Sequence, residues 1–271
     1  MKIIAAANPI CRIFIAVIFF ATTGLSFSET KSASKSAKDT FGNAHQMVLV
    51  TTKNWEAVPG VMRRFERKDS GESWSEAGSP IEIVVGRTGL AWGRGLHPTN
   101  SVGPQKVEGD GKSPAGIFRL SSAFGFASAE EMKSLKLPYL QVTDSLECVD
   151  DAHSVRYNTI VDRQHIINPD WKSSEKMLEI GEAYRLGIVV DHNVAPRTSG
   201  KGSCIFIHIW KGDGSGTSGC TAMEKSHMEK LISWLDAKTN PVLVQLPEAE
   251  FQRVESEWHL PSLKTNSPSA K

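Results

Sequence analysis

Short runs of β-branched and apolar residues, separated by turn residues, recur along the middle of the chain. Such runs are typical of β-strands, and glycine-rich breaks at 93–95, 109–111, 200–202 and 212–216 fall between them. We expect strands at 46–52, 61–66, 81–86, 117–120, 156–161, 187–191, 204–210 and 242–246. The pattern therefore predicts a strand-rich fold.

Patterns typical of helices are fewer. Residues 128–131 (SAEE) fit a capping box that opens a short helix, and residues 174–184 are a second candidate. A third helix is predicted over 224–238, because Met228, Leu231, Ile232 and Leu235 share one face. We therefore expect an α+β fold, mostly β: a mixed sheet or β-sandwich with a few flanking helices.

The two ends of the chain lack this core pattern. Basic residues precede an apolar stretch at 13–25, and small residues follow it, which predicts a signal peptide at 1–28, cleaved after Ser28. An uncleaved anchor is the alternative, although a spanning helix needs about 20 apolar residues. We interpret 29–44 as a flexible leader and 251–271 as a tail, which leaves one domain over 45–250.

Composition and charge exclude some classes of protein. With 40% apolar and 23% charged residues, the chain has the usage of an ordinary globular protein. Its 31 basic and 30 acidic residues give no cationic excess for a phosphate backbone, so nucleic acid is not an expected partner. We expect an exported monomer with no membrane segment after cleavage.

Export changes how the four cysteines are interpreted. Cys11 leaves with the signal, and the remaining three cannot all pair within one chain in an oxidising compartment. A Cys148–Cys204 disulfide and two reduced core thiols are open alternatives, and a Cys204–Cys220 bridge is a third. The unpaired cysteine is therefore a functional candidate, with an inert buried thiol as the alternative.

One segment combines a nucleophile and a base. His208 lies in an apolar strand pattern, and Cys220 follows a glycine after a loop long enough to fold back. Glycine before the thiol allows a sharp turn, where consecutive amides can hold an oxyanion, and a nearby helix start at Glu224 would favour the thiolate. If the loop folds back, the pair suits acyl transfer; a structural histidine and a core cysteine are the alternatives.

These residues resemble the L,D-transpeptidase family of the YkuD type. The matching segments are 202–208 (GSCIFIH) and 217–220 (TSGC), preceded by 85–92 (VGRTGLAW) and 108–118 (EGDGKSPAGIF). Further matches at 150–151, 157–158, 174–177 and 190–193 extend the resemblance over about residues 81–245. It implies the YkuD-like fold.

The resemblance also implies roles. Cys220 would attack a diamino-acid carbonyl in a peptidoglycan stem peptide, and His208 would take the thiol proton. The backbone amides of Gly219 and Cys220 would hold the oxyanion, and a terminal D-Ala would leave. A second stem's amine would then resolve the thioester into an L,D cross-link, with no metal or cofactor, in the periplasm or cell envelope.

The sequence departs from the family at three positions. Ser218 stands where histidine is common, Ala222 where arginine or asparagine is common, and Ile209 where serine or glycine helps to orient the histidine. A backbone carbonyl would then have to fix the tautomer of the ring.

Substrate contact is predicted for four side chains around the pair. Ser218 takes the position before the Gly-Cys pair, and Tyr157 binds substrate or simply packs. Asn193 lines the cleft or serves a turn. Trp210 forms a wall for the stem peptide or packs in the core.

Other functions remain open at this point. An L,D-carboxypeptidase or another cysteine hydrolase would use water in place of the amine. An inactive wall-binding module would keep the fold without the chemistry, although the presence of both Cys220 and His208 argues against it.

Overall fold

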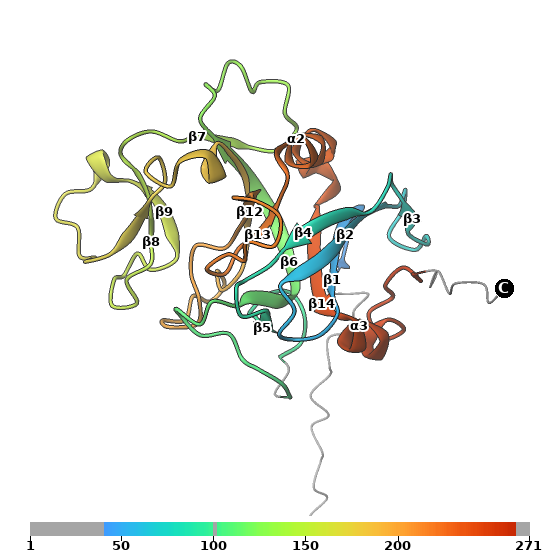
Figure 1. Cartoon of the computed structure of the whole chain (residues 1–271). Coiled ribbons are helices and arrows are strands. Elements are labelled where there is room, and N and C mark those ends of the chain that lie inside the picture. The colour runs from blue at the N-terminus through green and yellow to red at the C-terminus, as the bar shows by residue number, and fades with distance from the viewer. Residues whose placement is uncertain (1–40, 100–101, 264–271) are drawn as a thin grey trace, which may run out of the picture. The chain divides into compact units, whose positions relative to one another are not determined.

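A sheet that closes on itself is the main feature of the computed structural model, which describes residues 41–99 and 102–263. Within those residues the sheet has 11 strands, and its barrel runs β1-β14-β6-β11-β12-β13-β4-β2 before β2 pairs with β1 again. The barrel strands are β1 (Gln46–Thr52), β2 (Pro59–Glu66), β4 (Ile81–Val84), β6 (Ser113–Gly125), β11 (Leu186–Val190), β12 (Phe206–Ile209), β13 (Thr221–Met223) and β14 (Val242–Pro247). Short strands β3 (Ser75–Glu76), β5 (Leu90–Trp92) and β7 (Tyr139–Gln141) extend it. The expected mostly β fold is confirmed (Figure 1).

The first strand shows why the apolar runs predict this barrel. β1 is buried along its whole length, and it pairs antiparallel with β2 and parallel with β14. Its apolar residues fill the main core, which also includes Phe118 and Leu243 from the neighbouring strands. A seven-residue run with no alternation is what burial on both faces requires.

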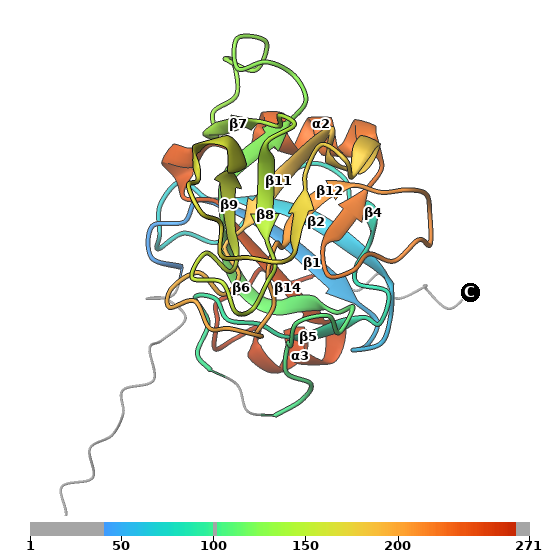
Figure 2. The same cartoon turned by 90° about the vertical axis from the view of Figure 1, so that its left-hand side faces the viewer.

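A second, three-stranded sheet lies beside the barrel, on the side away from β3 (Figures 1 and 2). It consists of β8 (Leu146–Val149), β9 (Thr159–Asp162) and β10 (Ser174–Lys176), all from the chain between β7 and β11. A separate apolar cluster joins this sheet to the barrel, with Phe124, Met177, Tyr184 and Phe206 among its members. The Cys148–Cys204 disulfide crosses the same junction.

Two of the three predicted helices need correction. Residues 174–184 begin as strand β10 and end in the 3-10 helix η2 (Gly181–Tyr184), because Glu175 pairs with Cys148 and Gly181 has a φ of +76°. The capping bonds between Ser128 and Glu131 form, but only turns follow them, with Pro138 a few residues on. Two short 3-10 helices, η1 (Arg163–His165) and η3 (Ala237–Thr239), were not predicted.

The third predicted helix is present as α2 (Lys225–Trp234). The Glu224 side chain caps it by accepting from the Ser226 amide, and Met228, Leu231 and Ile232 are buried. It ends four residues before the predicted end, where Leu235 takes an extended conformation. α2 packs on β11 and β12, and α3 (Glu248–Val254) lies at the opposite end of the barrel (Figures 1 and 2).

The expected tail is partly structured. Helix α3 crosses the predicted boundary at residue 250, and Phe251, Val254, Trp258 and Leu260 are buried against the main core. The composition of this segment predicted a tail because its few apolar side chains are spread among many polar residues. The predicted signal peptide and most of the predicted leader lie outside the described residues, among which no helix is long and apolar enough to cross a membrane.

Candidate active site

His208 and Cys220 meet at one cavity because β12 and β13 run side by side. The two strands pair in parallel with His208 opposite Ala222, so Cys220 lies just before β13 at the level of Phe206. On its other side His208 is opposite Gly187 of β11, so small residues flank the imidazole on both neighbouring strands. The imidazole and the sulfur line the same cavity of about 220 Å³. The folding back of the loop, on which the predicted pair depends, is therefore present.

The sulfur of Cys220 rests as a protonated thiol. It accepts a hydrogen bond from the Phe206 amide at 3.3 Å and donates to the Cys204 carbonyl at 3.5 Å. Burial, reinforced by the charge of Glu175, raises the pKa of the thiol to about 12. The expected help from a helix start is absent, since β13 separates Cys220 from the first turn of α2. Attack by this sulfur therefore needs a base at the moment of reaction.

His208 has the protonation state of such a base. Its Nδ1 lies 2.8 Å from the carbonyl oxygen of Ile209, which assigns the ring proton to Nδ1 and leaves the lone pair on Nε2. Ile209 replaces the serine or glycine that commonly orients this histidine in the family, and its own backbone carbonyl is the group that fixes the tautomer here. Burial lowers the pKa of the imidazole, so the ring is neutral near pH 7. The edge of the Tyr184 ring packs against it, with centroids 5.4 Å apart.

The turn before the nucleophile is held by hydroxyl groups. Thr217 Oγ1 and Ser113 Oγ donate to the Cys220 carbonyl at 2.6 and 2.7 Å, and Ser113 in turn accepts from the Gly86 amide at 2.8 Å. These bonds fix the backbone at Cys220 and join it to the segments that the sequence motifs supply. Neither hydroxyl was singled out from the sequence, although both lie inside the matching motifs.

The two predicted oxyanion donors, the amides of Gly219 and Cys220, differ in how far they are available to a substrate. The Gly219 amide already donates to Thr217 Oγ1 at 3.1 Å, so this donor is committed to the turn. A Cβ at Gly219 would come within 3.3 Å of the Ile205 side chain and the Lys112 carbonyl. The turn is therefore closely packed around Gly219, and the amide of Cys220 remains as the candidate donor.

The cysteine pairing is settled by the fold. Cys148 on β8 forms a disulfide with Cys204, and Cys220 is the free cysteine among the described residues. Cys204 has a φ of +54°, and its carbonyl receives the Cys220 thiol. The alternative bridge between Cys204 and Cys220 does not form.

Two of the four predicted substrate contacts line the cavity. Ser218 and Trp210 lie on it, and Ser218 Oγ accepts from Arg87 Nη1 at 3.3 Å. A cation thus stands beside the position where the family commonly has histidine. The link between residue 87 and residue 218 is long-range and leaves no signal in the sequence.

The other two lie elsewhere. Tyr157 is buried and donates to the Glu108 carboxylate. The Asn193 side chain donates to the carbonyls of Thr198 and Gly202, at 2.9 and 3.0 Å, and accepts from the Thr198 amide. Packing and turn support, the alternatives weighed for these residues, describe what the structure shows of them.

The cavity also contains two side chains that were not predicted as site residues. Glu175 lies on β10, and Tyr184 lies at the end of η2. The Tyr184 hydroxyl donates to Glu175 Oε2 at 2.6 Å, and the Tyr184 and Cys220 side chains each affect the pKa of the other.

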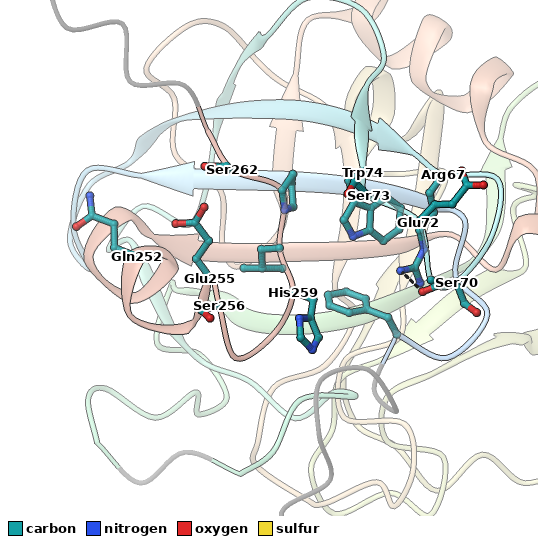
Figure 3. Close-up of a pocket in the computed structure, with 14 residues that line it drawn as sticks. Arg67, Ser70, Glu72, Ser73, Trp74, Gln252, Glu255, Ser256, His259 and Ser262 are labelled. Atoms are coloured by element: carbon teal, nitrogen blue, oxygen red, sulfur yellow. Dashed lines mark hydrogen bonds between the residues drawn. The ribbon is translucent and has the colours of Figure 1, made fainter.

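A larger cavity, of about 840 Å³, lies between the segment 67–74 and the segment 252–262. Figure 3 shows Arg67 and Trp74 on one side of it and Gln252 and Glu255 on the other. Its lining includes no cysteine. The Arg67 guanidinium is stacked on Trp74 and donates hydrogen bonds to the backbone carbonyls of Ala44 and Ser70. The smaller cavity is therefore the candidate active site, because Cys220 and His208, the predicted nucleophile and base, both line it.

The barrel, together with a cavity lined by a free cysteine and a histidine, defines a β-rich domain with one candidate active site. The model of the YkuD family, the L,D-transpeptidase catalytic domain, matches residues 77–244. The chain belongs to this family.

Comparison with individual proteins adds little to the family assignment. The chain is similar to the crystal structure of the helical cell shape determining protein Pgp2 from Campylobacter jejuni, with 15% identity and a TM-score of 0.35. The match covers 75% of this chain and 48% of that one, so the chain spans about half of that protein's length. No curated protein matches the chain.

Proposed function

We propose that the protein is an exported cysteine transpeptidase, which acts on peptidoglycan stem peptides through a thioester on Cys220. The observation that carries this proposal is that Cys220 and His208 line one cavity in a chain of the L,D-transpeptidase family. Carboxyl-terminal D-Ala and the side-chain amine of a second stem are the groups exchanged.

The first half of the reaction forms the thioester. His208 Nε2 takes the thiol proton as the Cys220 sulfur attacks the carbonyl carbon of the stem's diamino acid. Proton removal and attack belong together, because a thiol with a pKa of about 12 has almost no free thiolate at neutral pH. The Cys220 amide donates to the oxyanion, and the imidazolium then gives its proton to the leaving D-Ala nitrogen.

The second half resolves the thioester. The amine of another stem attacks the acyl carbon, His208 takes one of its protons, and the thiolate leaves and is reprotonated. The amide formed replaces the amide broken, and the thioester conserves the acyl group's reactivity between the two steps. The chemistry is therefore complete without ATP, metal or cofactor.

Substrate contact is assigned to Ser218 and Trp210. Trp210 is half-buried and offers an apolar surface to a peptide. Ser218 accepts a hydrogen bond from the Arg87 guanidinium, which places a cation next to Ser218. A cation at the rim suits a substrate that bears free carboxylates. We propose a monomer that works in the periplasm or cell envelope after cleavage of residues 1–28, and the Cys148–Cys204 disulfide supports an oxidising compartment.

Purified stem tetrapeptides test this function and its main competitor in one assay. A transpeptidase yields cross-linked dimers and free D-Ala, whereas an L,D-carboxypeptidase yields tripeptide and free D-Ala. The matched control is Cys220→Ala, which should yield neither. Tripeptide without dimer would replace the transpeptidase by a hydrolase, and no product from the native chain would indicate the inactive wall-binding module.

A further inference from the structure

The Tyr184 hydroxyl lies near both a half-buried carboxyl group, that of Glu175, and the proposed nucleophile, Cys220. It donates to Glu175 Oε2 at 2.6 Å, and it lies close enough to the Cys220 sulfur for each group to affect the pKa of the other. All three side chains line the cavity with His208, yet the proposed acyl transfer uses neither Glu175 nor Tyr184. A tyrosine in this position has one hydrogen to donate and two possible recipients.

The surroundings of the Glu175 carboxyl group favour its protonated, uncharged form. Asp150 from the end of β8 and Glu108 from the loop before β6 repel its charge, and Tyr184 from η2 is its donor. Burial is the largest effect and, with the two neighbouring carboxylates, raises the pKa of Glu175 to about 7, although the hydrogen bond from Tyr184 lowers it.

Charged and titratable groups also face this network from other elements. Cys220 lies before β13, His208 lies on β12, and Lys211 lines the cavity from the loop after β12. Lys106, which is ion-paired to Asp110 at 2.6 Å, acts on the thiol from further away.

The two protonation states of Glu175 place the tyrosine hydrogen differently. When Glu175 is ionised, the Tyr184 hydrogen belongs to the carboxylate, and the tyrosine oxygen offers the sulfur only a lone pair. The sulfur then has no hydroxyl donor, so the thiolate is not favoured and the thiol keeps the proton that it donates to the Cys204 carbonyl. When Glu175 is protonated, its own O–H donates to Tyr184, and the tyrosine hydrogen is released to the sulfur. A hydroxyl donor at the sulfur stabilises the thiolate.

We propose that Glu175 is a positioning residue, which acts through the Tyr184 hydroxyl to set whether the Cys220 sulfur is held as a thiol or stabilised as a nucleophile. The inference rests on the proposed function, in which Cys220 is that nucleophile. Protonated Glu175 is the active form.

The proton balance of the switch is simple. Glu175 takes one proton from water and donates it in a hydrogen bond to the Tyr184 oxygen. The Tyr184 hydroxyl hydrogen then turns from the Glu175 oxygen to the Cys220 sulfur, and no covalent bond between heavy atoms changes. The thiol proton itself goes to His208 Nε2 when the sulfur attacks. Loss of the proton from Glu175 to water reverses the hydrogen-bond chain.

Alkylation of Cys220 with iodoacetamide, followed by intact mass at several pH values, tests the inference without any substrate. Native protein should gain reactivity with pH up to about pH 7 and more slowly above it, because ionised Glu175 then opposes the thiolate. Glu175→Gln has no such ionisation, so its rate should match the native rate near pH 5.5. It should exceed that rate by about tenfold near pH 8.5, the usual effect of one adjacent like charge. A ratio that is constant with pH would overturn the proposal.

A double-mutant cycle separates the hydroxyl link from direct repulsion between charges. In a Tyr184→Phe background, the added Glu175→Gln change should lose most of its pH-dependent effect. If the tenfold gain persists there, Glu175 acts on the thiol directly and the proposal fails. Glu179→Gln is the matched control, because Glu179 is exposed and paired with Lys176 at 3.5 Å, and its profile should equal the native one.

The test remains decisive if Glu175→Gln does not fold, because the native profile must itself show the change of slope near pH 7. A straight native profile would refute the inference. The outcome is also independent of the proposed function. A chain that shows the profile but forms no product from stem tetrapeptides loses the function alone, and one that forms product with a straight profile loses the inference alone.

Discussion

The Cys148–Cys204 disulfide joins the two parts of the fold that line the candidate active site. Cys148 lies on β8, which pairs with the strand that carries Glu175, and Cys204 precedes the strand that carries His208. We expect its removal to cost stability and to disturb the nucleophile, whose thiol donates to the Cys204 carbonyl. The perturbation is the double variant Cys148→Ala with Cys204→Ala, since a single change would leave a thiol beside Cys220.

The size of the stability loss follows from the length of chain that the bond closes. The two cysteines are 56 residues apart, and the loop-entropy relation gives about 4 kcal/mol at 25 °C for a loop of that length. A loss of this size is a large share of the stability of an ordinary domain.

Urea unfolding of the oxidised native chain and the double variant measures this loss. The native chain treated with a reductant should match the variant, and Cys220→Ala, which keeps the disulfide, should lose much less. In the variant, the rate of Cys220 alkylation should no longer change its slope near pH 7, because the disulfide no longer ties β8 and β10 to the barrel. A free energy of unfolding within about 1 kcal/mol of the native value would refute the reasoning, because it lies far below what the relation predicts.

Three further predictions concern the site. His208→Gln should slow acylation of Cys220 by about 10²-fold or more with little loss of stability, and an unchanged rate would remove the imidazole from the mechanism. Thr217→Val removes a donor to the Cys220 carbonyl and should cost about 1 kcal/mol in urea unfolding, together with slower acylation; native behaviour would contradict the role of the turn. Glu175 has a pKa of about 7 in the folded chain against its usual 4.5, so the native chain should lose stability as the pH rises from 4.5 to 7. Glu175→Gln should therefore gain stability relative to the native chain between pH 5 and pH 8, and a constant difference would contradict this.

Local sequence patterns predicted the elements that form with little help from distant segments. β1 has the predicted bounds because its apolar run is buried on both faces, and α2 begins where Glu224 caps it. The His208–Cys220 pair could be predicted because the strand, the glycine turn and the two motif segments that contain them all lie within residues 202–220.

Long-range pairing explains what the sequence pattern missed. Residues 174–184 have helix-compatible composition, but the pairing of Glu175 with Cys148 and the positive φ of Gly181 decide the outcome. Glu175 and Tyr184 line one cavity with Cys220, which belongs to a later segment of the chain. Trp258 sits in a polar stretch, and its burial depends on where α3 packs. Each of these depends on partners that periodicity within one segment does not report.

The central claim is that Cys220 is the acyl-accepting nucleophile and His208 its base. Incubation with a carbapenem, followed by intact mass, tests this most directly. The native chain should gain one carbapenem mass, His208→Gln should gain it far more slowly, and Cys220→Ala should gain none. An unmodified native chain, or an adduct that still forms in Cys220→Ala, would contradict the account.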